Sequence, residues 1–192
     1  MADLLTTYNP TKVLLQIEPN LSDGTFNGRA SRDLQFTSVR VARFYEFNEG
    51  YPVYASVDVE GFTHDTESEV LTIPLDPPST PESTENGFYI ALEYTGAIGA
   101  LGETGGIFAV DETTLEANLR DGNAHRVFPS YQGGVYTKFW LTVITDERTR
   151  VESNLDDAGH QDFDGKVKNN FSADQISIED VAFRVTPIVD ME

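Results

Sequence analysis

The stretch that most constrains the fold is residues 133–145, GGVYTKFWLTVIT, which carries the only tryptophan of the chain. Most of its residues are β-branched or aromatic, a composition that favours a pleated sheet. Apolar side chains fall on both faces of the expected strand, with Phe139 and Leu141 on one face and Trp140 and Ile144 on the other. Such a strand is typical of the centre of a two-layer β domain. We therefore expect Trp140 to be buried inside the fold.

Further strand-like segments recur along the chain and are separated by turn signals. They cover residues 12–18, 34–47, 52–60, 69–75, 87–95, 107–110, 125–128 and 175–189. In the last segment the apolar parity changes, which predicts a bend near Glu179 and Asp180. Residues 21–32 contain the strong turn signals Asp23-Gly24 and Asn27-Gly28, which predict a tight hairpin or an ordered loop. Residues 146–170 are polar and acidic.

Residues 111–121, DETTLEANLRD, hold the one helical pattern. Asp111 is suited to cap a first turn, and Leu115 and Leu119 recur one turn apart. Many short strands with one short helix predict an all-β fold, an antiparallel β-sandwich or jelly-roll-like domain.

The expected organisation is an extended N-terminal arm at residues 1–11 followed by a single sandwich domain at 12–192. Within that domain, residues 76–87 contain three prolines and no large apolar side chain, which predicts an exposed loop. A linker between two smaller domains is the alternative interpretation of this segment.

Charge and cysteine content exclude several classes of function. The formal net charge is −19, which repels phosphate backbones and anionic lipid surfaces, so neither nucleic acid nor membrane is an expected partner. Without cysteine, disulfides and thiolate chemistry are excluded. No apolar run approaches the roughly 18 residues that span a bilayer. The first residues also lack the basic and apolar regions of a signal peptide.

The best candidate for a metal site is the acidic stretch 156–165, DDAGHQDFDG. Asp157, Asp162 and Asp164 supply carboxylates, and calcium loops place such groups at alternate positions so that their oxygens point inward. Phe171 stands where an EF-hand has its bidentate glutamate, so the pattern is incomplete. A solvated acidic loop is the simpler interpretation, with calcium as the alternative, and no other cofactor is expected.

No catalytic motif accompanies these features. The chain has no GxSxG elbow and no phosphate-binding glycine loop, and its three histidines lie far apart in sequence. We therefore expect a protein that is not an enzyme. Sugar binding is a second possibility, because carbohydrate modules stack sugar rings on exposed aromatic side chains. In support, residues 176–183, ISIEDVAF, resemble the final strand of some carbohydrate-binding jelly rolls, which implies a lectin-like module that could depend on calcium.

The leading expectation is a virion structural protein, a capsid decoration (cement) protein of a tailed bacteriophage that binds and stabilises the assembled shell. Its partners would be the major capsid protein or other virion proteins, with assembly in the host cytoplasm and self-association into a homo-oligomer. Apolar and aromatic side chains near the two ends would form the interface, because such groups dominate interface energetics. These side chains are Leu4, Leu5, Tyr8, Ile188 and Val189.

Overall fold

The computed structural model describes residues 12–28, 35–48, 51–65, 70–74, 88–128 and 136–188. These residues are nearly all β, which confirms the predicted fold class. The chain falls into two compact units, residues 1–34 with 95–192 and residues 35–94. The predicted arm at 1–11 and loop at 76–87 lie outside the described residues, and a single domain over 12–192 stays a prediction.

Consecutive strands in the described part of the chain are most often joined as antiparallel hairpins. In chain order they are β1 (Lys12–Asn20), β2 (Thr25–Gly28), β3 (Gln35–Asn48), β4 (Tyr51–Asp58), β5 (Thr63–Asp65), β6 (Val70–Thr72), β7 (Phe88–Ala97), β8 (Gly106–Ala109), β9 (Leu115–Asn118), β10 (Tyr136–Thr145), β11 (Thr149–Ser153), β12 (Asp156–Phe163), β13 (Lys166–Ser177) and β14 (Ala182–Pro187). Two short 3₁₀ turns, η2 (Asn123–Arg126) and η3 (Ile178–Asp180), complete the set.

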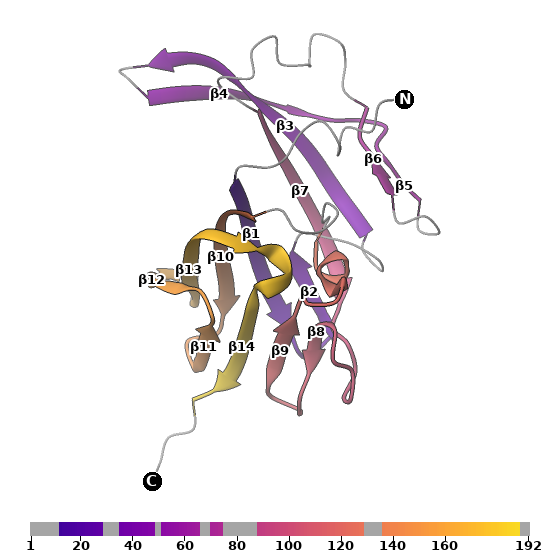
Figure 1. The fold of residues 1–192 in the computed structure, drawn as a ribbon, viewed down its shortest axis with the longest axis vertical. Coiled ribbons are helices and arrows are strands. Elements are labelled where there is room, and N and C mark those ends of the chain that lie inside the picture. Colours follow the sequence, from indigo (N-terminus) through magenta and orange to yellow (C-terminus); the bar gives the residue numbers. More distant parts are fainter. Residues whose placement is uncertain are drawn as a thin grey trace. The chain divides into compact units, whose positions relative to one another are not determined.

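The first unit is a sandwich of two sheets (Figure 1). The larger sheet has the strand order β12-β13-β10-β1-β2, with β7 next to β2, and the smaller sheet has the order β11-β14-β9-β8. Within the larger sheet β10 and β13 run antiparallel, whereas β1 and β10 run parallel and pair Leu14 with Trp140. The predicted strand at 133–145 is therefore confirmed as a central strand over its described part.

The core of this unit comes from alternate residues of its strands, because alternate side chains of a strand point to the same side of the sheet. Their removal from water is the main favourable term in folding. The larger sheet contributes Leu15, Ile17, Phe139, Leu141, Val143 and Phe171, and the smaller sheet contributes Leu115, Ala117, Phe183 and Val185.

The predicted bend near Glu179 and Asp180 is confirmed, and it carries the chain from one sheet to the other. β13 ends in the larger sheet, η3 turns the chain, and β14 begins in the smaller sheet. Ile178 and Val181 on either side of the acidic pair are both buried. The parity change in the sequence marks this crossing.

Of the hairpin and the ordered loop predicted for residues 21–32, the structure shows a hairpin at Asp23-Gly24, whereas the second turn signal, Asn27-Gly28, lies in β2. β1 and β2 pair antiparallel around a turn in which Gly24 has φ +64°. Asn20 stabilises the turn from its first position: its Nδ2 donates to Asp23 Oδ2 at 2.7 Å, and its Oδ1 accepts the hydroxyl of Ser22 at 2.7 Å.

The predicted helix at residues 111–121 is wrong. Asp111 does cap a turn, since its Oδ1 accepts the backbone N–H groups of Thr113 and Thr114, both at 2.8 Å. The chain then continues as β9, which pairs with β8 and β14 and buries Leu115 and Ala117. A helix of about three turns is marginal alone, so strand pairing on both sides of β9 outweighs it.

The strand predicted at residues 125–128 is wrong as well. The segment forms the 3₁₀ turn η2 and its continuation, in which Ala124 and Val127 are buried. Their spacing of three residues is that of a 3₁₀ helix, and Val127 N donates to Ala124 O at 3.0 Å. Four apolar-rich residues are too few for periodicity to separate the two structures.

In the second unit, β3 lies between β7 and β4, and β5 pairs with β6 in a separate two-stranded sheet. β3 and β4 form the antiparallel hairpin that residues 34–47 and 52–60 predict. A register shift between Phe44 and Glu46 adds a bulge to β3.

Candidate binding face

Trp140 is not buried, contrary to the expectation from sequence. Its exposed fraction is 44%; Leu14 beside it on β1 is 50% exposed, and Tyr136 further along the same face of β10 is 66% exposed. Phe139 on the other side of β10 is fully buried. The smaller sheet covers only one face of the larger sheet in this unit, and an apolar pattern on both sides of a strand does not reveal which face stays in water.

We refer to the outward-facing side chains of β1, β10 and β13 as the outer face. They are Lys12, Leu14, Gln16 and Glu18 on β1, Tyr136, Lys138, Trp140 and Thr142 on β10, and Lys166, Lys168, Asn170 and Ser172 on β13. The strand register aligns them in rows across the sheet. One row holds Leu14, Trp140 and Ser172, and an aromatic side chain thus has an aliphatic neighbour on one side and a hydroxyl on the other.

The outer face carries all four lysines of the protein. Two of them form ion pairs: Lys138 Nζ lies 3.2 Å from Asp174 Oδ1, and Lys166 Nζ lies 2.5 Å from Glu18 Oε1. Each of these lysines lies on a short polar–apolar alternation in the sequence, but only the register places them on one face.

The other two lysines are next to aromatic rings. Lys12 Nζ is 5.4 Å from the centroid of the Trp140 ring, and Lys168 Nζ is 3.5 Å from that of Phe163. Both distances are within the range of cation–π attraction.

The pair between Lys166 and Glu18 closes one end of the outer face. These residues belong to β13 and β1, which flank β10, so their side chains reach each other across β10. Ile144 of β10 has the parity of the outer face yet is buried. The hydrogen bond with Glu18 is the main reason that the pKa of Lys166 is raised.

A polar row lies beside Trp140 and consists of Gln16, Thr142 and Asn170. Thr142 Oγ1 donates to Asn170 Oδ1 at 2.9 Å. That bond leaves the two N–H groups of the Asn170 amide free to donate to a ligand, while Gln16 is exposed. The outer face therefore combines aromatic, cationic and hydrogen-bonding groups in a small area.

The acidic stretch 156–165 is not the loop that its sequence predicts. Asp157 and Asp162 lie in β12, an edge strand whose residues are all exposed, and Asp164 begins the turn to β13 with φ +50°. Asp157 Oδ1 already accepts the N–H of Gly159 at 2.7 Å. Among the described residues, no three His, Asp or Glu side chains come close enough to hold a metal ion. Calcium binding at this stretch stays a prediction.

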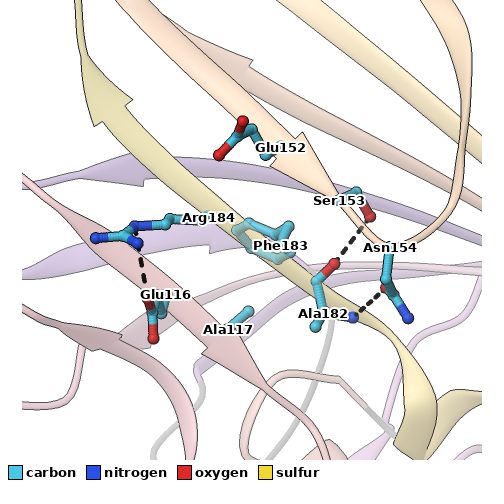
Figure 2. A pocket seen from close by; sticks show the side chains of 8 residues that line it. All are labelled: Glu116, Ala117, Glu152, Ser153, Asn154, Ala182, Phe183 and Arg184. Carbon is cyan, nitrogen blue, oxygen red and sulfur yellow. Dashed lines mark hydrogen bonds and ion pairs between the residues drawn. The ribbon is translucent and has the colours of Figure 1, made fainter.

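A shallow hollow of about 260 Å³ lies on the outward side of the smaller sheet (Figure 2). Its charged side chains are paired within the protein, with Arg184 Nε 3.5 Å from Glu116 Oε1. Its polar side chains are engaged too, since Ser153 Oγ donates to Ala182 O at 2.8 Å and Asn154 Oδ1 accepts the N–H of Ala182 at 2.8 Å. This arrangement stabilises the join between β11 and β14 and offers no nucleophile with a base beside it.

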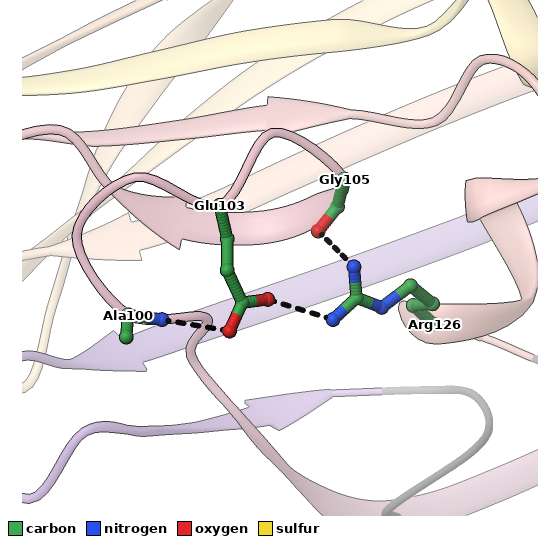
Figure 3. A network of polar contacts seen from close by, with 4 residues as sticks. All are labelled: Ala100, Glu103, Gly105 and Arg126. Carbon is green, nitrogen blue, oxygen red and sulfur yellow. Dashed lines mark hydrogen bonds and ion pairs between the residues drawn. The ribbon is translucent and has the colours of Figure 1, made fainter.

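A second polar network orders the glycine-rich segment at residues 96–106 (Figure 3). Arg126 donates to Glu103 Oε2 at 2.8 Å and to the carbonyl oxygen of Gly105 at 3.0 Å. Glu103 also accepts the N–H of Ala100 at 3.4 Å, and these bonds, chiefly that from Arg126, lower its pKa. The network explains why this segment is ordered, and its role is structural.

Of the side chains expected to form an interface, the described residues include only Ile188, which is 53% exposed. Its backbone N–H donates to the carbonyl oxygen of Arg148 at 2.8 Å. Leu4, Leu5, Tyr8 and Val189 lie outside the described residues.

In the part of the chain that the structure describes, no helix is long and apolar enough to cross a membrane. No protein-family model matches the chain, and no curated protein matches it. The outer face is therefore interpreted from its own chemistry.

Proposed function

We propose that this protein is a non-enzymatic virion accessory protein, a capsid decoration protein of a tailed bacteriophage that docks on the assembled shell and stabilises it. The main support for docking is that Leu14, Tyr136 and Trp140 expose apolar area on the outer face. Burial of this area on a partner is favourable, and Trp and Tyr are the side chains that most often dominate binding energy. The all-β fold and the acidic, cysteine-free composition support the assignment to a virion.

In this proposal the partner is the major capsid protein or another virion protein, and the protein assembles there as a homo-oligomer. The predicted arm residues Leu4, Leu5 and Tyr8, together with Ile188 and Val189, would extend the contact to neighbouring subunits. Most of the negative charge would then face solvent, where it favours solubility.

Co-sedimentation with shells assembled from the capsid protein of the same genome tests this proposal. The full chain should sediment with the shells, and Trp140→Ala should reduce the bound fraction at least tenfold. Leu101→Ala is the control, because Leu101 is 63% exposed in the segment between β7 and β8, is not part of the outer face, and should leave binding unchanged. Deletion of residues 1–11 measures the contribution of the arm. If the unaltered chain stays in the supernatant, the docking proposal is wrong.

Carbohydrate binding is the second candidate function, and the exposure of Trp140 favours it. An aromatic ring in water offers a surface on which a sugar can stack. Asn170 and Gln16 lie beside it with amide groups that can bind hydroxyls. A glycan array separates the two functions, because a capsid-docking protein should bind no glycan there.

A further inference from the structure

The distribution of lysine on this protein is highly uneven. The formal net charge is −19, yet all four lysines lie on the outer face together with the only tryptophan. Fewer carboxylates lie on this side of the sheet: Glu18 and Asp174 each pair with a lysine, and Asp156 of β12 lies opposite Ser172. Asp146 and Asp164 also act on Lys166 at one end of the face. On β1, β10 and β13 the outward-facing lysines nevertheless outnumber the carboxylates, in contrast to the molecule as a whole.

The positive charge of this region is only partly neutralised. Lys138 and Lys166 each have a carboxylate partner. In the described part of the chain, Lys12 and Lys168 contact aromatic rings and have no carboxylate within ion-pair distance. Lys12 is held near Trp140, so a cation stands beside the exposed ring. An anionic group of a ligand that stacks on this ring would meet Lys12.

We propose that the outer face is a binding site for a carboxylate-bearing polysaccharide. A sugar ring stacks on Trp140, its carboxylate pairs with Lys12, and its hydroxyls bind Asn170 and Gln16. Tyr136 lies four residues along β10, about 13 Å from Trp140, a span that suits an oligosaccharide better than a single sugar. This inference rests on the second function proposed above and is an alternative to the first, which places a shell protein on the same face.

Two other occupants fit the composition less well. Protein interfaces are depleted in lysine relative to the rest of the surface, whereas the outer face gathers every lysine of the chain. Single-stranded nucleic acid stacks on aromatic rings and pairs with cations, but its continuous phosphate charge is repelled by a protein of charge −19. A polymer with uncharged sugars between its carboxylates has widely spaced negative charges, which suit the two lysines without a carboxylate partner, Lys12 and Lys168.

Affinity electrophoresis with the full chain tests the proposal. The probes are hyaluronan and gellan, in which uncharged sugars separate the carboxylates, each beside its carboxyl-reduced neutral form. At least one acidic polymer should retard the protein, and its reduced form should bind at least tenfold more weakly. Trp140→Ala should abolish the retardation, and Lys12→Gln should weaken it about tenfold while Lys12→Arg retains it. Arg184→Gln, which removes a cation from the smaller sheet, is the control and should change nothing.

Three results would overturn the proposal, and each has a separate meaning. Equal binding of the acidic and neutral polymers would leave carbohydrate binding intact and refute the selectivity for carboxylates. Retardation by none of the polymers would refute carbohydrate binding on this face altogether, while co-sedimentation with shells would still decide the first function. Tighter binding of a thymidine oligonucleotide than of any polysaccharide would assign the outer face to nucleic acid.

Discussion

Phe139 and Trp140 are adjacent on β10, point to opposite sides of the sheet, and should respond very differently to truncation. Phe139 is fully buried between the two sheets of the first unit, whereas Trp140 is 44% exposed on the outer face. Phe139→Ala should therefore open a cavity in the core. Trp140→Ala should only remove a surface ring, since water and neighbouring side chains can occupy the vacated space.

The expected magnitudes follow from these exposures. Truncation of a buried phenylalanine costs about 3–5 kcal/mol of unfolding free energy, including the cavity. A tryptophan that buries about 200 Å² when enclosed would bury about 110 Å² here, or about 2.8 kcal/mol at 25 cal/mol per Å². Compactness of the unfolded chain lowers that estimate to about 2 kcal/mol. Phe139→Ala should thus be the more destabilising change by about 2 kcal/mol.

Urea denaturation followed by far-ultraviolet circular dichroism measures both variants, because this signal does not depend on the tryptophan that one of them lacks. The native protein supplies an independent check, since Trp140 is its only tryptophan and should emit at long wavelength and be quenched readily by acrylamide. If Trp140→Ala destabilised as much as Phe139→Ala, or if the fluorescence were shielded from acrylamide, the assignment of the two faces would be reversed.

Three further predictions concern the ion pairs and one glycine. Since the pKa of Lys166 is raised above 10.5, the stabilisation by its ion pair with Glu18 is present below that pH and is lost as the pH rises through the raised value. Urea titrations at high pH should show a loss of less than about 1 kcal/mol of unfolding free energy, as for other exposed pairs, and Lys166→Met should abolish it. The pKa of Glu103 is lowered below 4.5, so its stabilisation is present above that value and disappears as the pH falls through the lowered pKa. In Glu103→Gln the hydrogen-exchange protection factors of the surrounding loop, corrected for intrinsic exchange rates, should no longer fall in acid, and an unchanged fall would contradict the pair with Arg126. Gly106 has φ +77° and an added Cβ would lie 3.1 Å from Arg126 Cβ, so Gly106→Ala should cost about 1–3 kcal/mol in thermal unfolding; Gly102→Ala, at φ +93° with open space around it, should cost less.

Much of the fold could be predicted because it depends on local chemistry. Side-chain alternation locates β1, β3, β4, β7 and β10, since a strand half-covered by another layer needs a repeat of two residues. The turn at Gly24 needs a positive φ, which glycine adopts without strain. The bend before Val181 is visible because apolar parity must reset when the chain changes sheets.

Other elements could not be predicted because tertiary pairing decided them. Residues 115–118 have both a helical and a strand-like pattern, and they form β9 because β8 and β14 supply hydrogen bonds on both sides. β12 has no apolar pattern at all, and it is a strand because the register with β13 pairs its backbone. The residues of β9 and β12 do not reveal which strands pair with them, because strand formation depends on tertiary context.

The outer face shows the same division at the site. The sequence by itself determined that the chain is all-β, that β10 is central, and that its side chains alternate between two faces. Only the tertiary structure decided which face the smaller sheet covers, and hence that Phe139 is buried and Trp140 meets water. The parallel register of β1 beside β10 then placed Lys12 next to Trp140, although more than a hundred residues separate them. Strand pairing acts between backbones and is nearly blind to sequence distance, so a binding face assembled across strands leaves no motif along the chain.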